Sequence, residues 1–335
     1  MYVQVNRARS SSRNLPCSVP QGSIAGPVLF NAYASTLSDS VLDPSTCVMA
    51  YADDHIIYRS FCPQDGELAS VTSLQETLVA IKHWMDQNKL KMNSAKTEFI
   101  YFGSHHQLGK CNITGVVVDQ SIVERSSSIK YLGVIFDEQL RFENHISTKC
   151  RVASYNLYHI ASIRKHLTMD SAKSLASTMV LSHLDYCNSL LYGLPASTLK
   201  RIQRIQNRAA KIVLQRSRHD SRKRALYDLH WLPINYRIEY KIALLVFKCL
   251  HGAAPKYLVN LISLRDHVCV IRSTSQGSIL KVPSTSRKTF ADRSFSVCGP
   301  KVWNALPCHI RTCDDIDNFR KLLKTHYFVN AFIVI

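Results

Sequence analysis

The stretch "MAYADDHIIY", residues 49–58, places two carboxylates, Asp53 and Asp54, between two short apolar runs. Aliphatic and aromatic runs interrupted by a few small or polar residues are typical of two strands joined by a tight turn. Such a turn exposes its side chains while the strands fix their positions, so adjacent carboxylates there can bind a metal ion. The alternative is an ordinary acidic turn that is only solvated. The residues around the pair decide between the two interpretations.

The flanking sequence predicts an α+β region with an antiparallel sheet at its centre. Runs rich in aliphatic and aromatic residues favour strands, and apolar residues that recur every three or four positions favour helices. By these criteria we expect strands at 1–6, 46–51, 55–61, 97–103 and 128–136, and helices at 24–37 and 74–84. Because the two kinds of element are mixed rather than regularly alternating, an α+β plan fits best.

After about residue 140 the pattern changes to long amphipathic helices. In "TLKRIQRIQNRAAKIV", residues 198–213, the apolar residues share one helical face: Leu199, Ile202, Ile205, Ala209 and Ile212. A second apolar stripe leads to Gly252, which can end its helix, and an Asp cap precedes a third stripe that starts at Ile316. The stretch 272–300 shows no clear periodicity. The second part of the chain is therefore predicted to be mainly helical.

Positive charge is concentrated in residues 200–224, which contain ten lysines and arginines and a single acidic residue, Asp220. The whole chain carries 42 Lys and Arg against 24 Asp and Glu, a formal net charge of +18. Such an excess favours a polyanionic partner such as nucleic acid. The alternative is a basic protein whose helix face is simply solvated.

The cysteines and the N-terminus predict an intracellular protein, in the cytoplasm or nucleus, that is not secreted. The chain has 11 cysteines with no C-x-x-C pair, so neither a disulfide framework nor a zinc module is supported. The closest cluster, Cys308, His309 and Cys313, lacks the paired spacing of structural zinc sites. No segment has the apolar core of a signal peptide or approaches the roughly 20 apolar residues of a membrane span.

Four segments in a fixed order resemble the palm motifs of reverse transcriptases from non-LTR, LINE-type retrotransposons. They are "VPQGSIAGPVLFNAY" at 19–33, "YADD" at 51–54, "LKMNSAKTEFIYFG" at 90–103 and "IKYLGVIFDEQLRF" at 129–142. Later segments, including "SHLDYCNSLLYGLP" and "GPKVWNALP", resemble the thumb and C-terminal parts of jockey-like elements. The resemblance implies a partial right-hand polymerase palm at 1–139, a helical, basic, thumb-like module at 140–225 and a mostly helical region of unknown role at 226–335.

The resemblance also assigns roles to the residues of the turn. Asp53 would be a ligand of the catalytic metal and Asp54 its weaker neighbour, while Tyr51 and Ala52 would lie beside the primer end. The metal would be Mg²⁺, or Mn²⁺ in its place, and the partners would be an RNA template, a DNA primer and deoxynucleotides. No membrane and no other small-molecule cofactor is implied.

Further roles follow from the other matched motifs. Gln21 and Gly22 would lie against the template and the incoming nucleotide, where a glycine lets the backbone approach closely. Lys96 would neutralise or protonate the departing pyrophosphate. The residues that would support the primer are Tyr131, Leu132 and Gly133, which as a strand end could equally be core packing. The residues that would lie along the template–primer duplex are Lys200, Arg201, Arg204, Arg208 and Lys211.

One part of the family pattern is missing. Reverse transcriptases of this type carry another metal-binding aspartate before the Pro-Gln-Gly loop, yet residues 1–20 contain no acid. Two metal ions would then lack the carboxylate that bridges them. We therefore predict an N-terminally truncated RNA-directed DNA polymerase that is inactive by itself. The alternatives are a non-catalytic remnant that binds nucleic acid and a gene-model product without a stable role.

Overall fold

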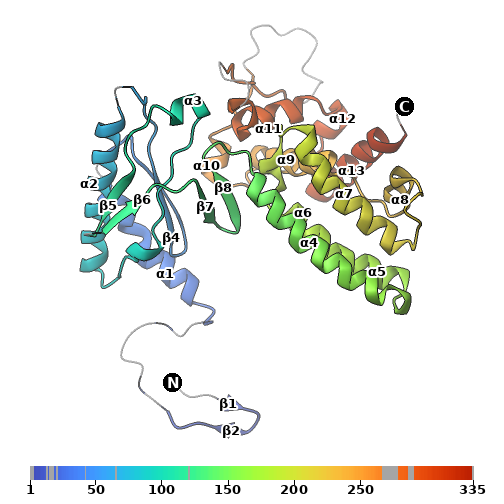
Figure 1. Ribbon diagram of the computed structural model, residues 1–335, viewed down its shortest axis with the longest axis horizontal. Helices are drawn as coiled ribbons and strands as arrows, with labels where there is room; N and C mark the ends of the chain where they lie inside the picture. Colours follow the sequence, from blue (N-terminus) through green and yellow to red (C-terminus); the bar gives the residue numbers. More distant parts are fainter. Residues whose placement is uncertain are drawn as a thin grey trace. The chain divides into compact units, whose positions relative to one another are not determined.

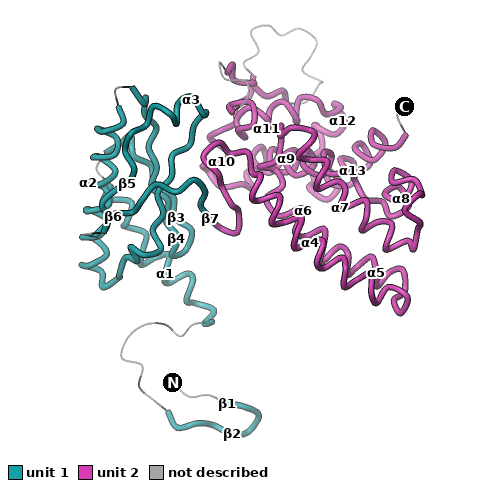
Figure 2. Tube along the Cα trace, viewed as in Figure 1, with its two compact units in different colours: residues 1–129 teal, residues 130–335 magenta. Residues whose placement is uncertain are grey.

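The chain folds into two compact units, residues 1–129 (unit 1) and 130–335 (unit 2) (Figure 2). The computed structural model describes residues 4–12, 14, 19, 22–41, 43–64, 66–119, 121–265, 278–285 and 290–333. Unit 1 mixes helices with short strands, whereas unit 2 is mainly helical (Figure 1). The predicted α+β class is thus confirmed. No helix in the described ranges combines the length and the apolar character that a bilayer crossing requires.

Unit 1 contains the two helices expected at 24–37 and 74–84 and the hairpin expected at 46–61, together with several elements that the sequence does not predict. Its elements are β1 (Gln4–Val5), β2 (Ala8–Arg9), α1 (Gly26–Ala34), η1 (Ser35–Ser40), β3 (Cys47–Tyr51), β4 (Asp54–Tyr58), α2 (Glu67–Gln87), η2 (Ser94–Lys96), α3 (His105–Leu108), β5 (Gly115–Val118) and β6 (Ser121–Glu124). β7 (Ser128–Tyr131) crosses the boundary between the units. The helix expected at 74–84 is α2, which starts a further two turns earlier.

The strands do not join into one central sheet, contrary to the prediction. In the described residues they form four separate two-stranded sheets. Residues 97–103, expected as a strand, make only an isolated bridge between Phe99 and Arg125. The physical reason lies in Tyr101, which is buried and donates a hydrogen bond from its hydroxyl to Glu67 at 3.1 Å. Side-chain contacts, rather than a strand ladder, hold this segment.

Glu67 is the polar centre of unit 1. Its carboxylate accepts hydrogen bonds from the backbone N–H groups of Asn112, at 3.0 Å, and Ile113, at 3.0 Å, besides the Tyr101 hydroxyl. Burial opposes ionisation, but these hydrogen bonds outweigh it and lower the pKa of Glu67. The small apolar core around it consists of Val71, Tyr101, Val116 and Val118. The start of α2 is therefore attached to the segment before β5 through one buried carboxylate.

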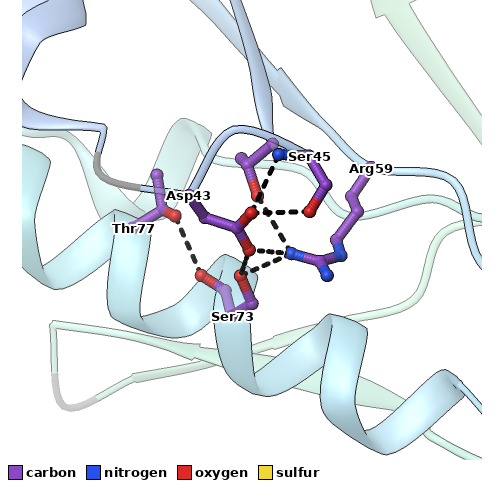
Figure 3. A network of polar contacts seen from close by, with 6 residues as sticks. Asp43, Ser45, Arg59, Ser73 and Thr77 are labelled. Atoms are coloured by element: carbon purple, nitrogen blue, oxygen red, sulfur yellow. Dashed lines mark hydrogen bonds and ion pairs between the residues drawn. The ribbon is translucent and has the colours of Figure 1, made fainter.

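A second polar network attaches the β3–β4 hairpin to α2 (Figure 3). The Asp43 carboxylate accepts hydrogen bonds from the Ser45 hydroxyl at 2.6 Å and the Ser73 hydroxyl at 2.6 Å, and it pairs with Arg59. These hydrogen bonds and the Arg59 guanidinium hold the pKa of Asp43 far below its usual value. Since Arg59 directly follows β4 and Ser73 lies on α2, the network fixes the base of the hairpin.

Unit 2 is built around long helices. Its elements are β8 (Val134–Asp137), α4 (Glu143–Ile163), η3 (Arg164–His166), α5 (Met169–Ala176), η4 (Ser177–Leu181), α6 (Ser182–Asp185), η5 (Asn188–Leu191), α7 (Ala196–Val213), α8 (Arg222–Asp228), α9 (Ile234–Leu250), α10 (Lys256–Val259), η6 (Ala291–Arg293), α11 (Phe295–Asn304), α12 (Cys308–Arg311) and α13 (Ile316–Phe332). The three predicted amphipathic helices are α7, α9 and α13.

An apolar core holds these helices together. Phe247 of α9 stacks on Phe319 of α13 with ring centroids 4.3 Å apart, and Trp303 of α11 also stacks on Phe319, with centroids 5.8 Å apart. Helix α11 was not predicted, because Gly299 and Pro300 interrupt its apolar pattern. Both residues are buried, and the absence of a side chain at Gly299 allows α11 to approach Val246 of α9 closely.

Candidate functional site: an acidic hairpin turn and a basic helix

The β3–β4 hairpin has the predicted two-residue turn. Tyr51 pairs with Asp54 in an antiparallel register, so Ala52 and Asp53 form the turn itself. Ala52 adopts a φ of 53°, a left-handed conformation that costs an alanine roughly 1 kcal/mol. The turn is thus a strained position within a regular hairpin.

The side chains of this turn face solvent. Asp53 and Asp54 are both exposed, and Tyr51 is 65% exposed. His55 Nδ1 lies 3.0 Å from the Asp53 carbonyl oxygen, while its Nε2 is buried without a partner among the described residues. A proton on Nδ1 would let His55 donate to that carbonyl and orient the turn. Sequence reasoning did not single out His55, because no motif signals a contact to a backbone carbonyl.

The turn alone does not make a complete two-metal site. Asp53 and Asp54 are oxygen ligands of the kind that Mg²⁺ prefers. Within the described ranges, however, no group of three or more His, Cys, Asp or Glu side chains could hold a metal ion. Asp53 and Asp54 could supply some of the ligands of one metal ion, but by themselves they cannot bind two.

The other predicted palm residues are distributed over unit 1. Gly22 has a φ of 86°, and a Cβ added there would meet no atom within 4 Å. Its backbone is therefore open to approach, and the conformation itself favours glycine. Lys96 ends η2 and is exposed. Gln21 lies outside the described residues. The hydrogen bonds and ion pairs seen in the described ranges do not connect Gly22 or Lys96 with the acidic turn.

A second two-residue turn connects β7 with β8. Leu132 and Gly133 both have positive φ, 44° and 78°, as in the type I′ turns that suit hairpins. The Tyr186 hydroxyl donates a hydrogen bond to the Leu132 carbonyl oxygen at 2.6 Å, and Lys149 Nζ lies 4.9 Å from the centre of the Tyr186 ring. Tyr131, at the end of β7, is half-buried. The turn is thus exposed at Leu132 and held from behind by Tyr186, a role that sequence reasoning missed.

Helix α7 has the two faces that its sequence predicts. Ile202 and Ala209 are buried on the inner side. Lys200, Arg204 and Arg208, spaced four residues apart, are exposed on the outer side. These three cations form one row, which we call the basic row.

The other two predicted cations of α7 have partners within the protein. Arg201 pairs with Glu143 of α4 at 2.7 Å and donates to the Ser147 hydroxyl at 2.7 Å. Lys211 donates to the carbonyl oxygen of Arg218 at 2.6 Å. The structure therefore separates cations that serve packing from those of the basic row.

Comparison with known proteins finds a family that the first segment matches. Residues 1–136 match the reverse transcriptase (RNA-dependent DNA polymerase) family. The chain is 27% identical over 218 residues to the probable RNA-directed DNA polymerase from transposon X-element of Drosophila melanogaster. The aligned residues are 63% of this chain and 23% of that protein. The resemblance to jockey-like reverse transcriptases is confirmed. No solved structure matches the chain.

Two further relatives extend the match. The RNA-directed DNA polymerase from mobile element jockey of Drosophila melanogaster is 28% identical over 151 residues, 44% of this chain and 16% of that protein. The retrovirus-related Pol polyprotein from type-1 retrotransposable element R1 of Nasonia vitripennis is 24% identical over 247 residues, 70% of this chain and 69% of that protein. The match thus spans about a quarter or less of the Drosophila proteins named here.

Proposed function

We propose that this chain is part of an RNA-directed DNA polymerase of a jockey-like retrotransposon, with a palm-like segment at 1–139 and a thumb-like segment at 140–225. The observation that carries the proposal is the acidic β3–β4 turn, because it lies inside the segment that matches reverse transcriptases. In this assignment Asp53 is the stronger metal ligand and Asp54 the weaker one. Residues 226–335 pack with the thumb-like segment in unit 2.

The remaining roles follow from the resemblance to reverse transcriptases, and the exposure and backbone conformation of these residues agree with them. Tyr51 and Ala52, beside the two carboxylates, would contact the primer end, and Gly22 would let backbone approach the incoming nucleotide. Lys96 would neutralise charge on the departing pyrophosphate. The β7–β8 turn, from Tyr131 to Gly133, would support the primer backbone. A divalent ion bound at the carboxylates would lower the pKa of the primer hydroxyl.

The nucleic-acid partners in this proposal are an RNA template and a DNA primer. The basic row of α7 supports this choice, since its cations are exposed and have no carboxylate within their own helix. Contacts to phosphates would make binding sequence-independent and sensitive to salt.

The incomplete set of carboxylates leads us to propose that the chain alone does not extend a primer. The test is extension of a DNA primer on an RNA template with Mg²⁺ and, separately, with Mn²⁺, using the native chain and Asp53→Ala. We expect no synthesis above the level of Asp53→Ala. Synthesis that Asp53→Ala abolishes would confirm the polymerase and contradict the inactivity.

Binding measurements on the same proteins separate the two nucleic-acid roles from the alternative of a product without a stable role. Asp53→Ala should leave the affinity for an RNA–DNA hybrid unchanged in both metals, whether or not the chain catalyses synthesis. Failure of the native chain to bind the hybrid at moderate salt would contradict the polymerase and the remnant alike.

A further inference from the structure

The outer face of α4 carries a cluster of exposed aromatic side chains. Tyr155 is 65% exposed and Tyr158 is 64% exposed, although both lie in the middle of a long helix. The exposed His159 ring lies between them, 4.5 Å from the Tyr155 ring centre and 5.6 Å from that of Tyr158. We call these three residues the aromatic cluster. A contiguous group of exposed rings, unlike a single one, is a feature of interaction sites.

The rings of this cluster hold one another in place. His159 meets Tyr155 at 74° and Tyr158 at 78°, both edge-to-face arrangements that aromatic pairs prefer. Such contacts restrict rotation of the side chains before any ligand binds. A flat ligand would therefore cost less side-chain entropy here than on isolated tyrosines.

The helix that carries the cluster is packed against the helix that carries the basic row, and α4 and α7 run side by side in the same direction (Figure 1). Near their starts, Thr198 of α7 donates to Glu143 of α4 at 3.2 Å. Near their ends, Arg164, which follows α4, donates to the Val213 carbonyl oxygen of α7 at 2.6 Å. Arg208 is therefore at about the level of Tyr155, since both helices rise equally per residue.

The charge of this surface is of one sign. On α4 the exposed Arg151 lies one turn before Tyr155, and the basic row follows α7. The only carboxylate in either helix is Glu143, which is already paired with Arg201. A second copy of the chain, with its net charge of +18, would be repelled, whereas a polyanion would be attracted.

Aromatic rings next to a row of cations are the combination that binds single-stranded nucleic acid, because unpaired bases stack on the rings while phosphates meet the cations. A duplex hides the faces of its bases and could use only the cations. We propose that the aromatic cluster of α4 is a stacking platform for unpaired bases of a single-stranded nucleic acid whose backbone follows the basic row. This proposal rests on the nucleic-acid role of unit 2 proposed above and adds a site for bases.

The test compares two probes that carry the same backbone charge. The intact chain is titrated by fluorescence anisotropy with an unstructured RNA of about 12 nucleotides, within the span of known single-strand sites, and with an abasic oligomer of equal length. We expect the native chain to prefer the base-bearing oligomer by about fivefold or more, since each stacked base contributes at least that much. Equal affinity for the two oligomers would overturn the proposal.

Substitutions locate the preference. Tyr155→Ala with Tyr158→Ala should abolish it while affinity for the abasic oligomer is unchanged. Tyr155→Phe with Tyr158→Phe should retain the preference. Tyr155→Leu with Tyr158→Leu should lose it, because stacking needs an aromatic ring rather than apolar surface. A preference that survives in the alanine or leucine variants would place the base contacts elsewhere on the chain, and one that disappears in the phenylalanine variant would assign it to the hydroxyl groups; either result would contradict the platform.

A parallel titration with an RNA–DNA hybrid duplex keeps this inference separate from the proposed function. The alanine pair should bind the hybrid as the native chain does. If hybrid binding is normal and the base preference is absent, only the platform is wrong. If the native chain binds no nucleic acid, the proposed function fails with it.

Discussion

Different interactions stabilise the interior of each of the two units. Unit 1 has a small apolar core and two carboxylates, Asp43 and Glu67, that each gather donors from distant segments. Unit 2 has a continuous core in which the rings of Phe247, Trp303 and Phe319 stack. The comparison teaches that the acidic turn is positioned by hydrogen bonds to charged groups, whereas the basic row is positioned by apolar packing.

The largest expected effect is the loss of a buried ring from unit 2. Trp303→Ala should lower the free energy of unfolding of unit 2 by about 3–5 kcal/mol, as large aromatic truncations in cores do. Trp303 is fully buried, and its Nε1 donates to the Ser278 carbonyl oxygen at 2.8 Å. Hydrogen exchange resolved by mass spectrometry should show faster exchange in α9 and α13 and an unchanged rate in α2. Equal acceleration in α2 would mean that the units do not unfold separately.

Acid should affect unit 2 over a pH range set by His145. Burial and then the charge of Lys149 lower the pKa of His145 from 6.5 to about 4. The unfolded chain therefore binds more protons between these values, so stability is full above pH 6.5 and falls as the pH drops towards 4. The loss should reach about 3 kcal/mol for a shift of this size.

Denaturant unfolding from pH 7 to 4 measures this dependence, and His145→Gln should reduce it, leaving the smaller slope of His326, whose pKa burial also lowers. An unreduced slope in His145→Gln would assign the effect to another group. Unit 1 should respond at lower pH, because the lowered pKa of Glu67 keeps that carboxylate ionised below its usual range.

Glu67→Gln tests the polar attachment in unit 1. The substitution keeps the size of the side chain but removes the charge that accepts hydrogen bonds from Asn112 and Ile113. We expect a loss of about 2 kcal/mol, since hydrogen bonds to a charged group contribute roughly 1.5–3 kcal/mol. Exchange should accelerate in α2 and β5, with α9 unchanged as the internal control. An unchanged α2 would show that the apolar cluster alone is sufficient.

The smallest effect concerns the β7–β8 turn. Tyr186→Phe removes the hydroxyl that donates to the Leu132 carbonyl oxygen and keeps the ring beside Lys149. The expected loss is about 1 kcal/mol, the typical net contribution of one hydrogen bond. Faster exchange confined to residues 131–134 would confirm it. Tyr186→Ala, which also removes the ring beside Gly133, should have the larger effect. Equal losses in the two variants would show that the ring adds nothing beyond its hydroxyl, and no loss in Tyr186→Phe would show that the hydrogen bond contributes nothing.

Local patterns in the sequence predicted the elements whose faces differ in polarity. The apolar stripes of α2, α7, α9 and α13 and the turn at Asp53 were recognisable because their signals lie within a few residues. The division into separate hairpins was not recognisable, since it depends on Tyr101 contacting Glu67 from a distant part of the chain. The same holds for α11, whose Gly299 and Pro300 make sense only once α9 is placed against it.

The candidate residues followed the same rule. Asp53 and Asp54 were recognisable from the order of the motifs around them, and the cations of α7 from the number of lysines and arginines in that stretch. Counting could not separate Arg204 from Arg201, because the partner of Arg201 is Glu143 on another helix. Nor did any local signal mark Tyr186, which lies 54 residues from Leu132 in the chain.

Binding of a template–primer is expected to depend on the basic row of unit 2 and not on the acidic turn of unit 1. The most direct measurement is the salt dependence of affinity for an RNA–DNA hybrid, compared among the native chain, Arg204→Ala with Arg208→Ala, Arg201→Ala and Asp53→Ala. We expect the double substitution to weaken binding and to reduce the slope of log affinity against log salt by about two, one for each lost phosphate contact. Arg201→Ala and Asp53→Ala should keep the native slope. A native slope in the double variant, or a loss of affinity in Asp53→Ala alone, would contradict the account.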